Sequence, residues 1–413
     1  SRLCIFDVYF NTYNVILRSG YPFWLIKNGL PFTFPKLAKD IQTEVLIVGA
    51  GISGALMRYH LIKAGISCVT VDARTVGLGS TCASTSLLQY EIDVPLCKLS
   101  EIVGKDHAQR AYHLCNEAIE KIGKIAADLD YGDFQRRDSL YFAAYKKDVP
   151  LLEREFKTRS EAGFDVAFLD ANAIRKQFGF SSPAAILSQH GAVIDAYSFT
   201  HRLLQYKEEW NHHIYDRTRI SNIKHDKNGV IAQTQDGYTI KARHVVYATG
   251  YEVTEIIDKK IVELKSTYAV ISEQYPKTQF WKNNTLLWST ANPYLYLRTT
   301  SDGRMLIGGR DDAFYDPTKR DALIQKKSKQ LVADFKKIFP GKAFDAEFSW
   351  TGTFGETKDG LPYIGAYQPV KNSYFALGFG GNGITFSLIA AQIITDLIQG
   401  KPNKDADIFS FDR

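Results

Sequence analysis

The feature that most constrains this chain is the run from Val45 to Gly54, which reads Val-Leu-Ile-Val-Gly-Ala-Gly-Ile-Ser-Gly. A short apolar strand leads there directly into the pattern G-x-G-x-x-G, and a helical stretch follows. A second apolar strand, residues 68–71, ends at Asp72, close to the offset of about 20 residues that a dinucleotide fingerprint requires. Strand, glycine turn, helix, strand and acid in this order predict a βαβ unit that binds a dinucleotide.

Each residue of this pattern has a physical role. Gly49 permits the tight turn, Gly51 lets the backbone approach a pyrophosphate, and Gly54 lets helix and strand pack closely. The helix N-terminus offers unpaired N–H groups and partial positive charge to the phosphates. The Asp72 carboxylate accepts hydrogen bonds from ribose hydroxyls. The alternative is a glycine-rich turn without a ligand, and the motif alone does not separate NAD from FAD.

Composition excludes several other classes of protein. Of the 413 residues, 45% are hydrophobic and 23% are charged, which is ordinary for a soluble globular protein of two or three domains. Basic residues number 51 and acidic residues 45, without a block of one sign, so we expect no nucleic-acid partner. Five cysteines without metal-type spacing favour a reducing, cytoplasmic compartment and no bound metal. No run approaches the roughly 20 apolar residues of an integral membrane span.

Signals for the dinucleotide recur in three separated segments, residues 45–91, 218–250 and 350–398. In the second segment, Asn-Gly and Asp-Gly turns join short strands into a meander that ends in Ala-Thr-Gly, at Gly250. One cofactor domain is therefore assembled from separated parts of the chain, with a second domain inserted between them. The expected boundaries are 1–40 for an N-terminal arm, 41–95, 196–262 and 346–413 for the cofactor domain, and 96–195 and 263–345 for the substrate domain.

Four signals outside the fingerprint favour FAD over NAD. The loop from Gly79 to Ser86 offers small side chains, hydroxyls and N–H groups, which allow a flat ring system to approach closely. The Ala-Thr-Gly turn brings another glycine back towards the dinucleotide. A third loop, Gly378-Phe-Gly-Gly-Asn-Gly, opens a helix whose dipole stabilises negative charge on a reduced flavin. The chain has one G-x-G-x-x-G, whereas an enzyme that passes electrons from NAD(P)H to FAD usually has two nucleotide sites.

In these motifs and their order, the chain resembles the D-amino-acid oxidase-like FAD-dependent oxidoreductases of the glycine oxidase and sarcosine oxidase type. The resemblance also rests on Trp350-Thr-Gly and on Asp359-Gly-Leu-Pro-Tyr-Ile-Gly, and it covers roughly residues 43 to 400. It implies an α/β fold, with a Rossmann-type FAD-binding domain and an inserted α+β substrate domain whose large sheet is mostly antiparallel. The flavin would lie between the two domains.

The resemblance also implies a set of residues that hold FAD without a covalent bond. They are Gly49, Gly51, Ile52, Ser53, Gly54, Asp72, Ala73, Arg74, Ser80, Thr81, Ala83, Ser84, Thr85, Ser86, Leu87, Ile220, Thr249, Gly250, Gly380, Gly381, Asn382, Gly383 and Ile384. Asp72 stands where the family more often has Glu, and Arg74 matches a basic position near the adenosine.

The family reaction transfers a hydride from a carbon that bears an amine to flavin N5, and water hydrolyses the imine that forms. Three residues are candidates for the catalytic site. Arg298 matches an arginine that clamps the substrate carboxylate, Lys265 would lie near the flavin and assist the reaction with oxygen, and Gln89 would face the substrate. Surface or packing roles are the alternatives for all three.

One departure from the family pattern concerns Phe354, because many relatives have an arginine a few residues after the Trp-x-Gly motif. Loss of that cation disfavours glycine or a simple D-amino acid and favours a different amine or a bulkier acid. The electron acceptor would be oxygen or a respiratory carrier. Competing hypotheses are oxidation of a 2-hydroxy acid, which needs a base such as His near Arg298, a non-catalytic flavin-binding module, and modification of a tRNA base.

Overall fold

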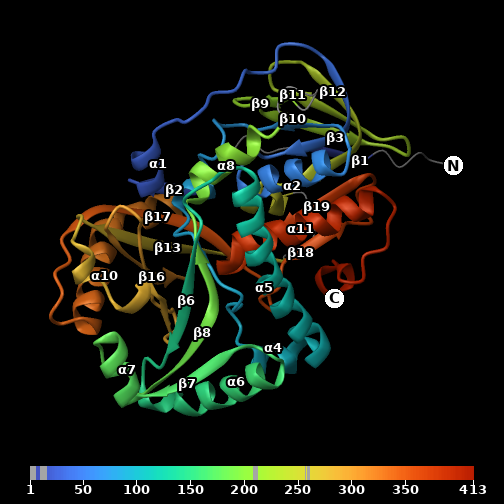
Figure 1. Cartoon of the computed structure of the whole chain (residues 1–413). Helices are drawn as coiled ribbons and strands as arrows, with labels where there is room; N and C mark the ends of the chain where they lie inside the picture. Colours follow the sequence, from blue (N-terminus) through green and yellow to red (C-terminus); the bar gives the residue numbers. More distant parts are fainter. Residues whose placement is uncertain (1–5, 10–15, 208–212, 256, 258–260) are drawn as a thin grey trace.

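The computed structural model describes residues 6–9, 16–207, 213–255, 257 and 261–413. Two large β-sheets lie side by side, and helices cover them (Figure 1). The helices are α1 (Phe23–Asn28), α2 (Ile52–Lys63), α3 (Ser80–Ala83), α4 (Leu96–Val103), α5 (Lys105–Asp128), α6 (Val149–Glu161), α7 (Ala171–Phe178), α8 (Ala196–Leu204), α9 (Pro317–Ala322), α10 (Ile324–Ile338) and α11 (Gly383–Ile398).

The first sheet contains the glycine-rich fingerprint. Its order is β1-β10-β11-β12-β3-β4-β9, and β19 pairs with both β12 and β18. The strands β19, β12, β3, β4 and β9 run parallel, whereas β1, β10, β11 and β12 form an antiparallel meander. The bounds are β1 (Phe6–Tyr9), β3 (Ile41–Val48), β4 (Cys68–Val71), β9 (Ile214–Tyr215), β10 (Ile220–His225), β11 (Val230–Thr234), β12 (Thr239–Tyr247), β18 (Tyr363–Ala366) and β19 (Ser373–Leu377).

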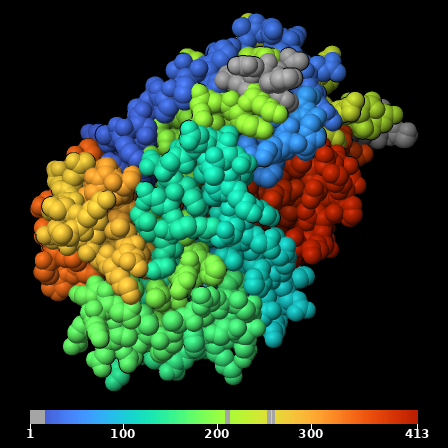
Figure 2. All heavy atoms as spheres, viewed as in Figure 1, coloured from blue at the N-terminus to red at the C-terminus, as the bar shows by residue number. Residues whose placement is uncertain are grey.

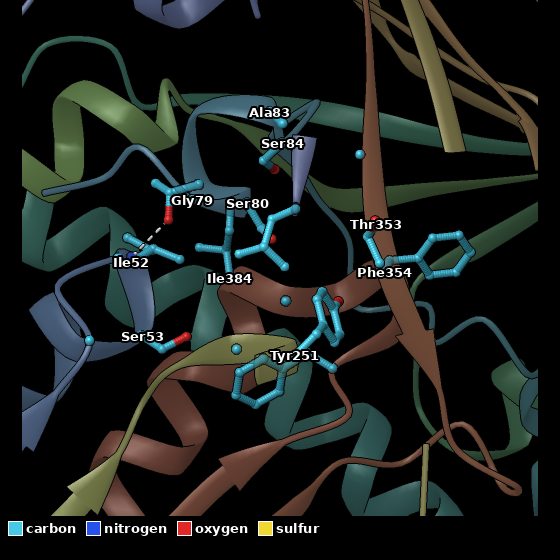
Figure 3. A pocket seen from close by; sticks show the side chains of 18 of the residues that line it. Ile52, Ser53, Gly79, Ser80, Ala83, Ser84, Tyr251, Thr353, Phe354 and Ile384 are labelled. Atoms are coloured by element: carbon cyan, nitrogen blue, oxygen red, sulfur yellow. Dashed lines mark hydrogen bonds between the residues drawn. The ribbon is translucent and has the colours of Figure 1, made fainter. Parts of the chain in front are cut away.

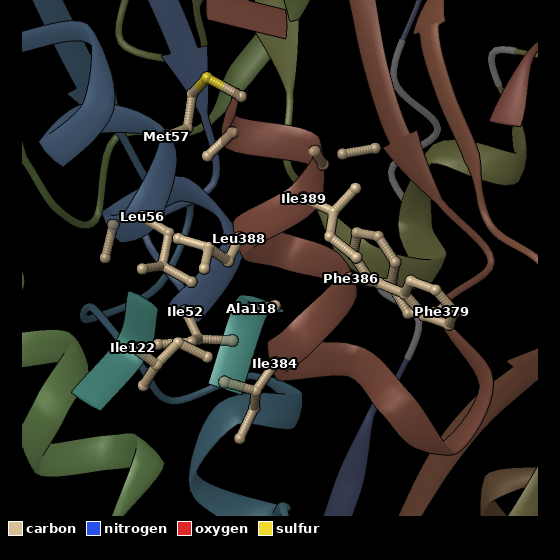
Figure 4. Packing of buried hydrophobic residues seen from close by; sticks show 14 of the residues in the cluster. Ile52, Leu56, Met57, Ala118, Ile122, Phe379, Ile384, Phe386, Leu388 and Ile389 are labelled. Carbon is tan, nitrogen blue, oxygen red and sulfur yellow. The ribbon is translucent and has the colours of Figure 1, made fainter. Parts of the chain in front are cut away.

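The parallel strands are apolar along their whole inner length because both faces of this sheet are covered. Val45 to Val48 are all buried, as are all four residues of β4. On one face, α2 and α11 pack against each other, with Leu388 of α11 directed towards Leu56 of α2 (Figure 4). Ile122 of α5 lies in the same cluster, so the largest core cluster joins the fingerprint helix to the C-terminal helix and to α5.

The second sheet is mostly antiparallel, in the order β2-β17-β13-β16-β15-β14-β6-β8-β5, with β7 paired to β8. Only β14 and β6 run parallel there, among the described pairs. The bounds are β2 (Arg18–Gly20), β5 (Leu87–Leu88), β6 (Gln135–Phe142), β7 (Val166–Asp170), β8 (Ala184–Val193), β13 (Glu263–Ser272), β14 (Leu286–Ser289), β15 (Tyr296–Thr299), β16 (Met305–Asp312) and β17 (Ala346–Glu356).

Helix α10 covers one face of the second sheet, and Leu331 and Phe335 of this helix are fully buried in the core cluster beneath it. The space-filling view shows the segment of α4 and α5, in teal, as a continuous covering down the middle of the molecule (Figure 2). It lies between the C-terminal segment, in red, and the α10 region, in orange.

The N-terminal segment does more than the surface arm that the sequence suggested. Strand β1 extends the first sheet by pairing with β10, and β2 extends the second by pairing with β17. Between β2 and β3, Trp24 of α1 is buried and its indole Nε1 donates a hydrogen bond to the Ser84 carbonyl at 2.7 Å. Residues 1–5 and 10–15 of the expected arm lie outside the described residues.

Strand membership also differs from the expected segment boundaries. Strand β17 belongs to the second sheet, although residues 346–413 were expected with the first. Strand β5 likewise pairs with β8 of the second sheet. Both strands carry cavity residues on the boundary between the two sheets, so the chain crosses from one sheet to the other beside the cavity.

One stretch, Gly380–Ile398, is long and apolar enough to cross a membrane by length and composition. In the fold, 67% of that window is buried inside the protein. The apolarity of α11 therefore has an explanation in packing, because α2, α5 and the first sheet surround it.

Candidate active site

A long cavity lies between the two sheets and brings the sequence-predicted cofactor residues together. The space inside it, including open solvent at its mouth, amounts to about 2080 Å³. Twenty-one of the predicted residues line it: Gly49, Gly51, Ile52, Ser53, Asp72, Ala73, Arg74, Ser80, Thr81, Ala83, Ser84, Thr85, Ser86, Leu87, Ile220, Thr249, Gly250, Gly380, Gly381, Gly383 and Ile384. Figure 3 shows Ile52 and Ser53 on one side, and Thr353 and Phe354 of β17 on the other.

The fingerprint glycines have the close approaches that their motif requires. Gly49 has φ of 109°, a conformation that favours glycine, and a Cβ there would lie 2.4 Å from the Ala248 carbonyl oxygen. A Cβ on Gly54 would lie 1.8 Å from the Gly49 carbonyl oxygen, so Gly54 packs helix against turn and does not line the cavity. Gly51 borders the cavity, and a Cβ there would lie 2.9 Å from the Thr81 hydroxyl oxygen.

Asp72 directly follows β4 and lines the cavity. Its carboxylate accepts hydrogen bonds from the backbone N–H of Ala50 at 2.7 Å and of Arg74 at 2.8 Å. Burial raises the pKa of Asp72 to about 6, although these two hydrogen bonds lower it. Each carboxylate oxygen can accept more than one hydrogen bond. Asp72 can therefore accept further hydrogen bonds from ribose hydroxyls in addition to those from the two backbone N–H groups. Arg74 forms a bidentate pair with Glu252, at 2.6 and 3.0 Å, on the cavity wall.

The loop after Gly79 is held from behind by two indoles. Trp350 of β17 donates from Nε1 to the Ala83 carbonyl at 2.8 Å, in addition to the contact of Trp24 with Ser84. The hydroxyl of Thr81 accepts the Ile52 N–H at 3.0 Å and so joins this loop to the start of α2. The loop is thereby fixed in the shape that borders the cavity.

The structure contradicts the expectation that Arg298 clamps a substrate carboxylate. Arg298 does not line the large cavity, and its side chain is buried. Nη1 donates to the carbonyl oxygens of Ser86 at 2.8 Å, Ile194 at 3.0 Å and Thr85 at 3.2 Å, and the guanidinium lies over the Trp24 ring. Burial lowers the pKa of Arg298 to about 9. Its donors are therefore used inside the protein, where they hold the loop.

Lys265 also lies outside the residues that line the cavity. It sits on β13 opposite Phe354 of β17, and its ammonium pairs with the Glu356 carboxylate. Lys265 was expected near the flavin, where it would assist the reaction with oxygen. The fold instead places it outside the cavity lining and pairs it with Glu356. Gln89 does line the cavity, and its amide nitrogen donates to the Ser139 hydroxyl at 3.3 Å.

The loop before α11 forms the cavity wall through Gly380, Gly381 and Gly383. The backbone N–H of Gly381 donates to the Asp93 carboxylate at 2.7 Å. Asn382 does not line the cavity, which corrects its expected contact with the cofactor. Its amide donates instead to the backbone carbonyls of Gln89 and Glu91, at 3.1 and 2.8 Å. These bonds connect the start of α11 to the segment that follows the loop from Gly79 to Ser86, hereafter the flavin loop.

The part of the cavity over the second sheet forms a chamber whose main residues the sequence reasoning missed. They are Tyr294, Tyr296, Asp311, Thr267 and Tyr268. Phe354 and Gln89, which the sequence had already singled out, complete the chamber. A Cβ on Gly308 would lie 2.4 Å from the Tyr296 ring, so that glycine makes room for the tyrosine. Two adjacent glycines, Gly308 and Gly309, inside an apolar strand were the signal that could have indicated an irregular strand with a side chain redirected there.

The residues present fit a flavin dinucleotide. In the loop after Gly79, the Ser80 hydroxyl is buried and has no hydrogen-bond partner among the described residues. The Thr249 hydroxyl is likewise buried without such a partner. Both residues line the cavity, so a bound phosphate or hydroxyl would satisfy them. The N-terminus of α2, the glycine cradle and the N-terminus of α11 all meet at this cavity.

Comparison with known proteins decides the family. The model of the family described as FAD dependent oxidoreductase (DAO) matches residues 44–397. The chain is a member of this family. As a DAO-family oxidoreductase it binds FAD, and the prediction of an α/β fold with a Rossmann-type FAD-binding part is confirmed.

Individual relatives of this DAO-family protein are distant in sequence. Gamma-glutamylputrescine oxidoreductase of Escherichia coli (strain K12) is 24% identical over 89% of this chain and 86% of its own length. Glycine oxidase of Bacillus licheniformis is 24% identical over 89% and 96%. The crystal structure of glycine oxidase from Geobacillus kaustophilus has a TM-score of 0.75 at 19% identity, covering 89% of this chain and 98% of the other.

Proposed function

We propose that this DAO-family protein oxidises a C–N bond of an amine or amino acid. The observation that carries the proposal is a single cavity that runs from the phosphate-binding turn of α2 to the aromatic chamber over the second sheet. Relatives that match over most of the chain have names that refer to gamma-glutamylputrescine and glycine, both of which contain nitrogen.

FAD, when bound, supplies a two-electron acceptor at flavin N5 that takes a hydride from the substrate carbon bearing the nitrogen. The residues of this chain bind FAD, orient the substrate and exclude water from the chamber. The N-terminus of α2 and the loop at Thr81, which line the cavity, would hold the pyrophosphate, and Ile220 and Arg74 would border the adenosine. The N–H groups at the start of α11, from Gly383, would supply partial positive charge that stabilises a reduced flavin bound in the cavity.

The chamber orients the substrate and excludes water. Tyr294, Tyr296 and Phe354 form aromatic walls, and the Gln89 amide adds a polar contact. A neutral amine has a lone pair that forms the C=N bond as the hydride leaves, and water later hydrolyses the imine. We expect FAD to be held without a covalent bond, as the family resemblance implies, and the described residues that line the cavity include no cysteine or histidine.

Oxidation of a 2-hydroxy acid is the competing activity. It calls for a cation to bind the carboxylate and a base to take the hydroxyl proton. No histidine lines the chamber in the described part of the chain, and Arg298 is occupied with backbone carbonyls. A glycerophosphate oxidase shares the fold, with a TM-score of 0.72, so the scaffold alone does not exclude a C–O substrate.

The test is an anaerobic titration of the purified, FAD-loaded protein. Amines, amino acids and 2-hydroxy acids are added separately, and bleaching of the visible flavin bands is recorded. Bleaching by an amine or amino acid supports the proposal. Bleaching by hydroxy acids alone would contradict it, and bleaching by none of them would favour the non-catalytic module. Oxygen uptake by the reduced protein then separates oxygen from a respiratory carrier as electron acceptor.

A further inference from the structure

A β-bulge in β16 directs Asp311 into the chamber. The register between β13 and β16 shifts there, so that Arg310 and Asp311 both lie opposite Thr267. Arg310 has φ of 60°, a strained value for a residue with a side chain. Its guanidinium turns to Asp334 of α10, with two nitrogen–oxygen distances of 2.6 Å, whereas Asp311 lines the cavity. Bulges redirect side chains in this way next to active sites.

Asp311 arrives in the chamber with unused hydrogen-bonding capacity. Its Oδ1 is buried and has no hydrogen-bond partner among the described residues. Thr267 hydrogen-bonds the carboxyl group, and the aromatic side chains of Tyr294 and Tyr296 are close enough for their pKa values to be raised by its charge. A buried carboxylate oxygen without a partner is costly, so the site is complete only with a donor in the chamber.

The other charges around Asp311 are mostly negative. Asp93 accepts from Gly381 and from the Tyr294 hydroxyl, and Lys265 is paired with Glu356. Burial raises the pKa of Asp311 to about 7, and this value already includes the raising effect of Asp93 and Glu356 and the lowering effect of Thr267 and Lys265. No group of three potential metal ligands occurs in the described ranges, so this acidic set is not arranged to hold a metal ion.

No lysine or arginine is among the described residues that line the chamber, and Lys265, which acts on Asp311 from outside it, is paired with Glu356. Among the described residues that line the cavity, the lysines and arginines are limited to Arg74 and Arg219. Arg74 is paired with Glu252, and Arg219 adjoins Ile220 at the adenosine end. An α-amino acid would bring its carboxylate beside Asp311 without a positive partner, and closely placed like charges repel. A positively charged amine would meet a carboxylate and aromatic faces.

We propose that Asp311 is the amine-binding group of this enzyme, and that the substrate is a primary or secondary amine without a carboxylate on the carbon that is oxidised. This inference rests on the proposed function and names its substrate class. An alkyl amine or a diamine fits the description, since a second amino group further along the chain would not disturb the contact at Asp311.

Asp311 also performs the proton step that must precede oxidation. The ammonium form of the substrate has no lone pair, so it cannot form a C=N bond. The Asp311 carboxylate takes one proton from the R–NH₃⁺ group, which gives a neutral carboxylic acid and a neutral R–NH₂ group, with charge conserved. A carboxyl whose pKa lies near neutral pH is suited to such a transfer.

The first test measures binding without turnover. The FAD-loaded protein is titrated at pH 8 with tert-butylammonium, which has no oxidisable C–H bond next to nitrogen, and with pivalate, its carboxylate counterpart. Perturbation of the flavin spectrum reports each Kd. We expect tert-butylammonium to bind at least tenfold more tightly than pivalate, and its affinity to fall as the pH drops below 7. Equal affinities, or tighter binding of pivalate, would overturn the proposal.

The second test uses matched substrates. Butylamine and norvaline differ only in the α-carboxylate, as do 1,4-diaminobutane and ornithine. We expect the amines to reduce the flavin at least tenfold more efficiently than their carboxylate counterparts. If the carboxylate forms react as well or better, the inference fails while the proposed C–N oxidation stands. If neither form reduces the flavin, the proposed function itself is refuted.

The variants Asp311→Asn and Asp311→Glu assign the effect to this residue. Asp311→Asn should weaken tert-butylammonium binding at least tenfold and slow flavin reduction by amines at least a hundredfold, whereas Asp311→Glu should retain most of the binding. Asp236→Asn, in a surface turn where it pairs with Lys36, is the matched control. The FAD spectrum of each variant shows whether it has folded. Unchanged binding in a folded Asp311→Asn variant would overturn the assignment, and the wild-type titrations decide the case if that variant does not fold.

Discussion

Nη1 of Arg298 lies 2.8 Å from the backbone carbonyl oxygen of Ser86, so the arginine that resembles a substrate clamp supports the flavin loop from behind. Arg298→Met removes the donor from four backbone carbonyl groups, those of Thr85, Ser86, Ile194 and Thr299, at a cost of about 1–3 kcal/mol for each group left buried without a partner. We expect weaker FAD binding, by at least tenfold, and a lower melting temperature. Fluorescence quenching of added FAD and a thermal melt measure the two effects.

Arg154→Met is the control for this substitution, because the Arg154 side chain is exposed, pairs with Glu101 at the surface and lies away from the cavity lining. It should change neither quantity. If Arg298→Met binds FAD normally but has a raised KM for substrate, Arg298 binds the substrate carboxylate after all and does not act by supporting the loop.

Gly51→Ala tests the phosphate cradle. The backbone of Gly51, with φ of −79° and ψ of −170°, suits any residue, so the effect of a Cβ is steric alone. That Cβ would lie 2.9 Å from the Thr81 hydroxyl oxygen, on the cavity wall. We expect FAD affinity to fall at least tenfold with little change in the stability of the FAD-free protein. Gly341→Ala, where a Cβ meets no atom within 4 Å, should leave FAD affinity unchanged.

The ionisation of Asp311 predicts a pH-dependent stability. Its pKa is about 7 in the folded protein, above the ordinary value of 3.8, so the folded state binds the proton more tightly than the unfolded chain does. Stability from this group is therefore full below about pH 4 and declines as the pH rises to about 7. Asp311→Asn removes the penalty, so its melting temperature should exceed that of the wild type by a few degrees at pH 8.

At pH 4, the same comparison should show no gain, because the carboxyl is then neutral in the folded protein. Thermal melts of both proteins at the two pH values provide the measurement. A gain of equal size at pH 4 and pH 8 would show that packing, and not charge, separates the variants.

Phe354→Arg places a cation in the chamber, at the position where many relatives have arginine. Phe354 lines the cavity, opposite Lys265 in the strand register. A guanidinium there would pair with an α-carboxylate and repel an ammonium group. We expect the ratio of flavin reduction rates for norvaline over butylamine to rise at least tenfold. Phe354→Leu controls for the loss of the ring, and a ratio that is the same in both variants would contradict the electrostatic explanation.

Local motifs placed the cofactor residues well because each motif folds within a short stretch of chain. The glycine turn, the loop after Gly79 and the loop before α11 each have a shape set by small residues nearby, and all three meet at one cavity. Gly54 and Asn382 were exceptions, because one packs against a backbone carbonyl and the other turns towards Gln89 and Glu91.

The substrate chamber could not be predicted in the same way, because distant strands build it. Whether Arg298 faces the cavity depends on Trp24 and on the carbonyls of a loop more than 200 residues away in sequence. Asp311 faces the cavity because of a one-residue shift between β13 and β16, which alternation of side chains along a strand does not anticipate. The sequence suggested Arg298 and Lys265 as the charged residues of the substrate site, whereas the fold places Asp311 there.

The N-terminal segment, which joins β1 to the first sheet and β2 to the second, has a consequence for how the protein is made. Its partner strands include β17, and the Ile16 carbonyl accepts a hydrogen bond from Arg320, 304 residues further along the chain. A ribosome releases these early residues long before their partners exist, so they must wait in an unpaired state. Completion of both sheets therefore comes late relative to the synthesis of this segment, which would benefit from protection by a chaperone in the meantime.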